Sequence, residues 1–72
     1  MPRLPVVSAA EALKAALSLN YSFLRQKGSH IILKNAKGKL LVIPNHKRLK
    51  KGTLLQIIKA LGVTKEDFIS LL

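Results

Sequence analysis

The apolar side chains change their repeat twice along the chain, and this order constrains the fold more than any other feature. A helical repeat of three and four residues runs over about 9–19 and returns over 53–61. Between these segments, short apolar runs are separated by glycine-containing turns, as in a β-meander. The sequence therefore predicts a helix, three strands and a second helix, followed by one short terminal helix.

The first helix has a start signal and a stop signal. Ser8 and Glu11 form a capping box, in which the Ser8 hydroxyl accepts from the amide three residues on and Glu11 reaches back. Asn20 is the expected left-handed stop after a helix over Ala9–Leu19. Its buried stripe is predicted to contain Leu13, Ala16 and Leu17.

Three antiparallel strands are predicted in the middle of the chain. They are expected over 21–26, 30–34 and 39–43, with turns at 27–28 and 35–38. Tyr21 and Phe23 are the only strand aromatics, and core packing explains both better than base stacking does. Pro44 ends the third strand, and a basic loop over Asn45–Lys51 follows.

The second helix is predicted to open at Gly52-Thr53 and to stop at Gly62. Its core-facing residues follow the i, i+3, i+4, i+7 pattern: Leu54, Ile57, Ile58 and Leu61. Thr64 is expected to cap the short terminal helix, in which Phe68, Leu71 and Leu72 are apolar.

An α+β fold follows, in which two amphipathic helices cover one face of a three-stranded sheet. This α-β-β-β-α order resembles the double-stranded-RNA-binding fold. At fewer than roughly 80 residues, the chain has no room for a deep cavity or a second domain, so 1–72 is expected to be a single domain. Before the first helix, Pro2 and Pro5 predict an extended arm over Met1–Val7.

Charge is distributed unevenly. The formal charge is +10, and no acidic side chain occurs between Ala12 and Lys65, whereas nine of the thirteen cations lie between Arg25 and Lys51. A field of one sign predicts a polyanionic partner, and nucleic acid is favoured over a merely solubilising surface. An anionic membrane is less favoured, because no basic helix face opposes a broad aromatic one.

Composition excludes several kinds of chemistry. Without cysteine there is no thiolate nucleophile or cysteine-ligated zinc, and a reducing compartment fits. The three acids, Glu11, Glu66 and Asp67, each fall in the first turn of a predicted helix, which leaves none for a metal cluster or a triad. The longest apolar run, Leu40–Ile43, is far too short for a membrane span, so a soluble cytoplasmic protein is expected, with no cofactor.

Histidine and cations remain, and this set suits RNA cleavage. RNA carries its own nucleophile, the 2′-hydroxyl. Its cleavage therefore needs only a group that transfers a proton and positive charge at the phosphate. If Lys27-Gly28 is the hairpin turn, Arg25 lies directly across from His30 and favours the neutral imidazole that a base requires. From spacing alone, an exposed edge histidine or an RNA-stacking one is favoured over a catalytic role for His30.

His46, in the basic loop, is better explained as a phosphate-binding or solvent-exposed residue than as a catalyst. Residues expected to contact the RNA, apart from His30, are Arg25, Lys27, Ser29, His46, Lys47, Arg48, Lys50 and Lys51.

The chain resembles the HicA family of toxins, small mRNA interferases of bacterial and archaeal toxin–antitoxin pairs. The matching features are spread over nearly the whole chain: Pro2–Pro5 with the helix capped by Ser8, Tyr21 with Arg25–His30, Lys37–Lys39, Val42–Pro44 with His46, and Lys51–Leu54. Asn20 stands where the family usually has Gly, and Asn35–Gly38 lacks the usual His-Pro-Asp.

This resemblance implies metal-independent cleavage of mRNA, with the histidine of the Gly-Ser-His run, His30, as the catalytic residue. It also implies a HicB-like antitoxin that binds and masks the active face. The free protein is expected to be a monomer. Two alternatives remain: a non-catalytic nucleic-acid-binding module with the same fold, and a ribosome-associated structural protein, for which such a charge is also ordinary.

Overall fold

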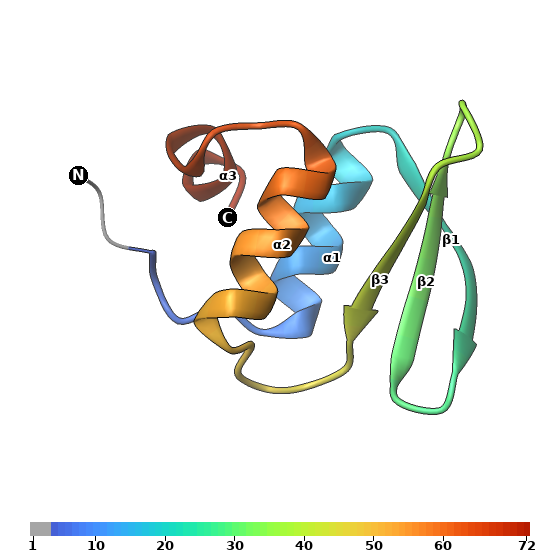
Figure 1. The fold of residues 1–72 in the computed structure, drawn as a ribbon, viewed down its shortest axis with the longest axis horizontal. Helices are drawn as coiled ribbons and strands as arrows, with labels where there is room; N and C mark the ends of the chain where they lie inside the picture. The colour runs from blue at the N-terminus through green and yellow to red at the C-terminus, as the bar shows by residue number, and fades with distance from the viewer. Residues whose placement is uncertain (1–3) are drawn as a thin grey trace.

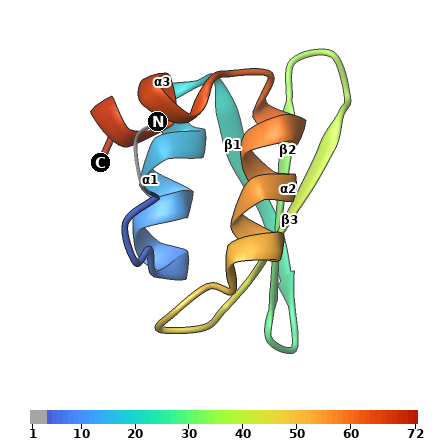
Figure 2. The ribbon, with the colours of Figure 1, turned by 60° about the vertical axis from the view of Figure 1, so that its left-hand side comes forward.

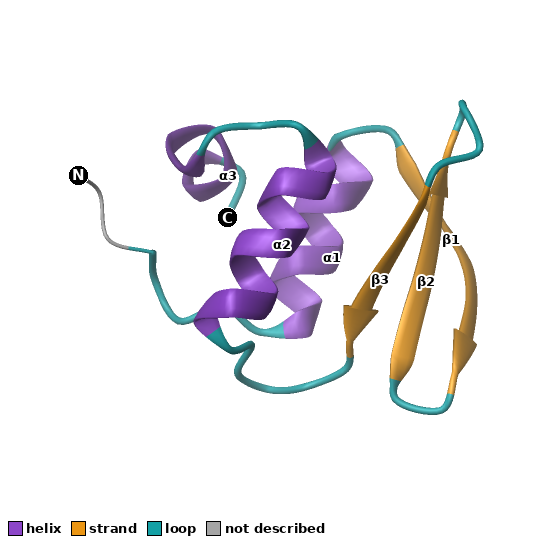
Figure 3. Cartoon of the chain, viewed as in Figure 1, coloured by secondary structure: helices purple, strands orange, loops and turns teal. Residues whose placement is uncertain are grey.

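A three-stranded antiparallel sheet and two helices form the two layers of the molecule. The computed structural model describes residues 4–72. The elements follow in the order α1 (Ala9–Ser18), β1 (Tyr21–Lys27), β2 (His30–Asn35), β3 (Leu40–Pro44), α2 (Lys51–Leu61) and α3 (Lys65–Ser70). Strand order in the sheet is β1-β2-β3, and α1 and α2 lie on the same side of it (Figures 1 and 3). The predicted α-β-β-β-α arrangement is confirmed.

Local signals set the limits of α1. The capping box is present: the amide of Glu11 donates to Ser8 Oγ, and the Ser8 amide donates to the Glu11 carboxylate. Asn20 adopts the left-handed conformation, with φ 69°. The predicted stripe is wrong at Leu17, which is 48% exposed. The buried residues of α1 are alanines, and Leu17 lies about 140° around the helix from one of them, Ala12.

Aliphatic and aromatic side chains alone fill the core between the layers. Among the described residues no buried residue is polar or charged. From α2, Leu54, Ile57 and Ile58 are buried as predicted, whereas Leu61 is only half-buried. Gly62 ends this helix with φ 74°, a left-handed conformation that glycine adopts without steric penalty.

The terminal helix α3 packs away from the sheet, at the far side of α1 and α2 (Figures 1 and 2). Thr64 caps it by accepting from the amide of Asp67, as the sequence predicts. Phe68 is fully buried, so it anchors α3 to the core.

The first hairpin turn lies one residue later than predicted. Lys27 and His30 are paired, so the two turn residues are Gly28 and Ser29. Of these, only Gly28 has a positive φ, 58°, as a two-residue turn with glycine first requires. A bulge between Phe23 and Arg25 then shifts the register of the rest of β1.

Phe23 does not pack in the core, which corrects another expectation. It pairs with the fully buried Leu33 but is itself 56% exposed. β1 is an edge strand, and Tyr21 is its only buried residue. Past Tyr21, this edge of the sheet extends beyond the cover of the helices.

The remaining boundaries agree with the predictions within a residue. Leu4–Ser8 adopt no helix or strand, and the part of the predicted arm over 1–3 lies outside the described residues. Within 4–72, no helix is long and apolar enough to cross a membrane.

Candidate active site

His30 is the first residue of β2 and is exposed. Its direct cross-strand partner is Lys27, the last residue of β1. Directly opposed residues of an antiparallel pair point to the same face, with Cβ atoms about 5 Å apart. The imidazole of His30 and the ammonium of Lys27 therefore share one face. Ile31, the next residue along, is buried toward the helices, so this shared face is the one without helices.

Arg25 is not opposite His30, contrary to the expectation. It pairs with Ile32, because the turn begins at Gly28 rather than at Lys27. Arg25 keeps the same face as Lys27, two residues along the strand, and so is a diagonal neighbour of His30, at a typical separation of about 7–8 Å. The position closest to the histidine thus belongs to a lysine.

Hydrogen bonds hold the turn that precedes His30. Gln26 Nε2 donates to the Gly28 carbonyl at 3.1 Å. The amide of Asn45, just after β3, donates to the Ser29 carbonyl at 2.6 Å. The backbone leading into His30 is therefore fixed on both sides, while the Ser29 side chain remains exposed.

The basic loop over 45–50 is held by its own backbone. The His46 amide donates to the Pro44 carbonyl at 2.9 Å, and the His46 carbonyl accepts from the Ala9 amide at 3.0 Å. The Leu49 amide donates to the Val7 carbonyl at 2.8 Å, and the Leu49 side chain is buried. The loop thus passes beneath the start of α1 (Figure 2).

With the backbone and Leu49 turned inward, the polar side chains over 45–51 are exposed: Asn45, His46, Lys47, Arg48, Lys50 and Lys51. Lys50 is the N-cap residue of α2 and Lys51 is its first residue. The segment presents four cations to solvent within five positions, which fits contacts to a phosphate backbone.

The sheet brings the two histidines to the same end of the molecule. His30 pairs with Pro44, and His46 follows Pro44 by two residues. The Asn45–Ser29 hydrogen bond ties the two segments together at this end. The predicted RNA-contacting residues of the first hairpin and those of the basic loop therefore belong to adjoining surfaces.

One cation of this face was absent from the predicted set. Lys34 is exposed on β2, four residues after His30, and so lies on the same face of the strand. Side chains alternate between the two faces along His30–Lys34, and this alternation could have indicated from the sequence that Lys34 shares the face of His30. Ile32 and Val42 pair on that face between the two, and Val42 is 47% exposed, so the surface is apolar at its centre and basic around it.

The acidic side chains serve the helix starts. Glu11 lies in the first turn of α1, and Glu66 and Asp67 lie in the first turn of α3. Residues 4–72 contain no group of three or more His, Asp or Glu side chains that could hold a metal ion. Proton transfer by histidine beside fixed positive charge is the chemistry that this donor set supports.

A family model described as the HicA toxin of bacterial toxin–antitoxin systems matches residues 9–63, which is more than half of the chain. The matched range includes His30, Lys27 and the whole basic loop. Among curated proteins, no sequence matches this one significantly.

Proposed function

The chain belongs to the HicA toxin family, and on that premise we propose that it is an endoribonuclease that cleaves mRNA without a metal ion. The observation that supports this most directly is the pairing of His30 with Lys27 on the exposed, helix-free face of the sheet. This places a proton-transfer group and a fixed positive charge next to each other on an accessible surface.

In the proposed reaction, His30 accepts the proton of a ribose 2′-hydroxyl. The 2′-oxygen attacks the adjacent phosphorus, and the bond to the 5′-oxygen of the next nucleotide breaks. The products are a 2′,3′-cyclic phosphate and a 5′-hydroxyl, to which the imidazolium returns its proton. Lys27 and, farther away, Arg25 stabilise the charge that develops on the phosphate oxygens.

Binding of the substrate relies on the exposed cations rather than on His30. The basic loop and Lys34 extend the positive surface beyond the reacting phosphate. DNA can occupy such a surface but has no 2′-hydroxyl, so it is expected to bind without being cut. No step of this scheme requires a carboxylate, which agrees with the position of Glu11, Glu66 and Asp67 at helix starts.

A toxin of this family has an antitoxin partner. We propose a HicB-like protein that covers His30, either with an acidic surface or with a neutral lid over a basic rim. Opposite charge would accelerate association with a +10 protein, so the association rate is expected to fall as salt rises. The free toxin is proposed to be a cytoplasmic monomer.

The test compares the wild type with His30→Ala, and uses His46→Ala as the matched histidine control. In EDTA, the wild type is expected to cleave RNA, whereas His30→Ala is expected to lose at least about a hundredfold in rate. Since His30 is exposed, its loss should change the free energy of unfolding by less than about 1 kcal/mol.

RNA affinity should remain nearly unchanged in His30→Ala, because it depends on many cations. In cells, the same variant should abolish growth arrest and mRNA decay. Wild-type cleavage by His30→Ala, or activity that disappears in EDTA and returns with magnesium, would contradict the proposal. The first of these results would point to a different catalytic group, and loss of all cleavage by every form would favour an RNA-binding module.

A further inference from the structure

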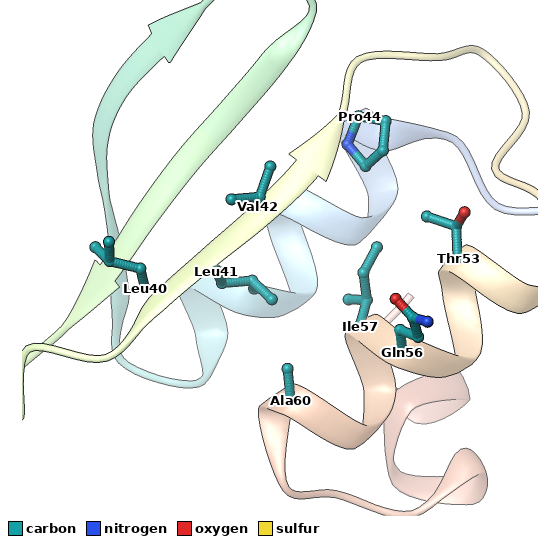
Figure 4. Close-up of a pocket in the computed structure, with 8 residues that line it drawn as sticks. All are labelled: Leu40, Leu41, Val42, Pro44, Thr53, Gln56, Ile57 and Ala60. Atoms are coloured by element: carbon teal, nitrogen blue, oxygen red, sulfur yellow. The ribbon is translucent and has the colours of Figure 1, made fainter.

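β3 is one of the two edge strands of the β1-β2-β3 sheet, and it lies beside α2 with a groove between them. The groove has a volume of about 380 Å³ and runs between β3 and one side of α2 (Figure 4). Its lining residues are Leu40, Leu41, Val42, Pro44, Thr53, Gln56, Ile57 and Ala60.

The backbone of β3 shows which of its groups face this groove. The Lys39 carbonyl accepts from Asn35, and the Asn45 amide donates to Ser29, so positions 39 and 45 face β2. Strand backbones alternate, and therefore Leu41 and Ile43 also bond toward β2, whereas Leu40 and Val42 direct their N–H and C=O groups away from it. Within residues 4–72, no side-chain hydrogen bond reaches these outward groups.

From this edge we infer that the groove receives an extended segment of a protein partner, which adds as a fourth strand beside β3. Main-chain bonds to Leu40 and Val42 would supply affinity, and the aliphatic part of the lining would accept alternate side chains. Pro44 has no N–H and closes the edge, so the added strand spans about five residues, or about 17 Å.

Charge determines which partner fits. Lys39 lies at one end of the groove, where its Nζ donates to the Ala60 carbonyl at 2.6 Å. Lys50 and Lys51 lie at the other end, just before Thr53, and all three cations are exposed. The fitting segment is apolar in its middle and acidic at both ends. On the proposed toxin–antitoxin role, on which the partner's identity rests, this segment belongs to the antitoxin.

Two other occupants fit less well. Pairing of β3 with β3 of a second copy would bring the flanking lysines of both copies together in either strand direction, and like charges oppose it. RNA is disfavoured in the groove itself, because the lining contains no charged residue for a phosphate and no aromatic residue for a base.

The test uses ¹⁵N-labelled protein and a synthetic nine-residue peptide, with five alternating valines and threonines between two glutamates at each end. Saturating peptide is expected to slow amide hydrogen exchange at Leu40 and Val42 at least tenfold. Leu41 and Ile43, which already bond to β2, serve as internal controls. The same core with lysine ends should bind at least tenfold more weakly.

Two pairs of variants separate backbone recognition from side-chain effects. Val42→Pro removes an outward N–H and should weaken binding at least tenfold, whereas Val42→Thr keeps it and should not. Should Val42→Pro unfold, the exposed helix position Gln56 supplies a second pair. Gln56→Glu should weaken the acidic peptide severalfold, and Gln56→Lys should not.

Unchanged exchange at Leu40 and Val42 with saturating peptide, or equal binding of the lysine-ended peptide, overturns the inference. Protection of these two amides by an RNA oligonucleotide instead of the peptide also overturns it.

A second experiment measures amide exchange at Leu40 and Val42 in the purified complex with the antitoxin. If the antitoxin binds but leaves both amides unprotected, the groove is not its site, although the toxin–antitoxin pairing stands. If the antitoxin does not bind, the pairing fails while the peptide still decides the groove.

Discussion

Lys27 and His30 are direct cross-strand partners that close the Gly28–Ser29 turn. This relationship places an ammonium group beside the candidate catalytic imidazole, where a guanidinium was expected. An ammonium is a compact charge on a flexible stem, whereas a guanidinium can hold two oxygens in a fixed plane. The proposed reaction requires positive charge near the phosphate oxygens, and Lys27 supplies the charge nearest to His30.

The pairing predicts that Lys27 matters more than Arg25 for the chemical step. Lys27→Ala should lower kcat for RNA cleavage at least about tenfold, because it removes the charge nearest the reacting phosphate. Arg25→Ala should lower kcat by less than about threefold and act mainly on KM, since Arg25 is a diagonal neighbour.

Single-turnover cleavage of a short RNA measures both effects. Lys27→Arg keeps the charge and serves as the control, with most of the activity retained. A larger loss of kcat in Arg25→Ala than in Lys27→Ala would show that the guanidinium reaches the phosphate despite its register.

The positive φ of Gly28 predicts that its replacement destabilises the protein. Gly28→Ala should lower the free energy of unfolding by about 1–2 kcal/mol, because Gly28 has φ 58° and an L-residue is strained there. Nothing lies within 4 Å of an added Cβ, so the loss is purely conformational. Since this turn orients Lys27 and His30, the cleavage rate should fall as well.

Gly52→Ala is the matched control. Gly52 lies within α2, and an added Cβ there also meets nothing within 4 Å. Alanine is the better helix former, so this variant should be more stable by about 0.5–1 kcal/mol. Urea unfolding of both variants gives the comparison. Equal changes in the free energy of unfolding at the two positions would mean that backbone strain does not determine the loss of stability in Gly28→Ala.

Local signals in the sequence were sufficient for most of the fold. Ser8 with Glu11, Asn20, Gly62 and Thr64 each specify a cap from groups within a few residues, and all four are confirmed. The strand order follows from the short turns, because antiparallel neighbours need no long connection. Such features depend little on the rest of the molecule.

The errors arise where distant contacts decide. Leu17 and Phe23 are apolar by type, but their exposure depends on how far the helices extend over the sheet, which no local pattern contains. A one-residue choice of turn decides that Arg25 pairs with Ile32 rather than with His30, and the bulge between Phe23 and Arg25 then shifts the rest of β1. The groove beside β3 is lined by residues between 40 and 60. It depends on how α2 packs beside β3, which no local sequence pattern contains.

RNA binding should depend steeply on salt. If about five phosphates of a single strand are neutralised, the log–log slope of the binding constant against salt is about −3 to −4. The double variant Lys47→Ala/Arg48→Ala should make the slope about 1.4 shallower, since both side chains are exposed in the basic loop. Fluorescence titration at four salt concentrations measures the slope, and a value near zero for the wild type would remove charge as the source of affinity.

Leu49 is predicted to hold the basic loop in place. Its side chain is 6% exposed between cationic neighbours, so Leu49→Ala should lower the free energy of unfolding by about 2–4 kcal/mol. RNA affinity should also fall below the wild-type value at a temperature where the variant is folded, because the loop loses its anchor. Leu24→Ala, at a position 45% exposed, is the control and should change stability by less than about 1 kcal/mol. A loss of stability without any loss of affinity would show that the loop needs no anchor to bind.

The dependence of the cleavage rate on pH distinguishes one proton-transfer histidine from two. An imidazole changes charge between about pH 5 and 8, and His30 and His46 are the only histidines in the chain. If His30 alone takes and returns the proton, kcat/KM for the wild type should show a single limb that rises with pH, and His46→Ala should keep that shape with a rate within about tenfold. If His46, at the same end of the sheet, donates to the leaving 5′-oxygen, the profile should instead be a bell, and His46→Ala should remove its alkaline limb. We expect the single limb, because His30 pairs directly with Lys27 in the sheet, whereas His46 lies in the basic loop outside it. A bell that loses one limb in His46→Ala would assign the second proton to His46.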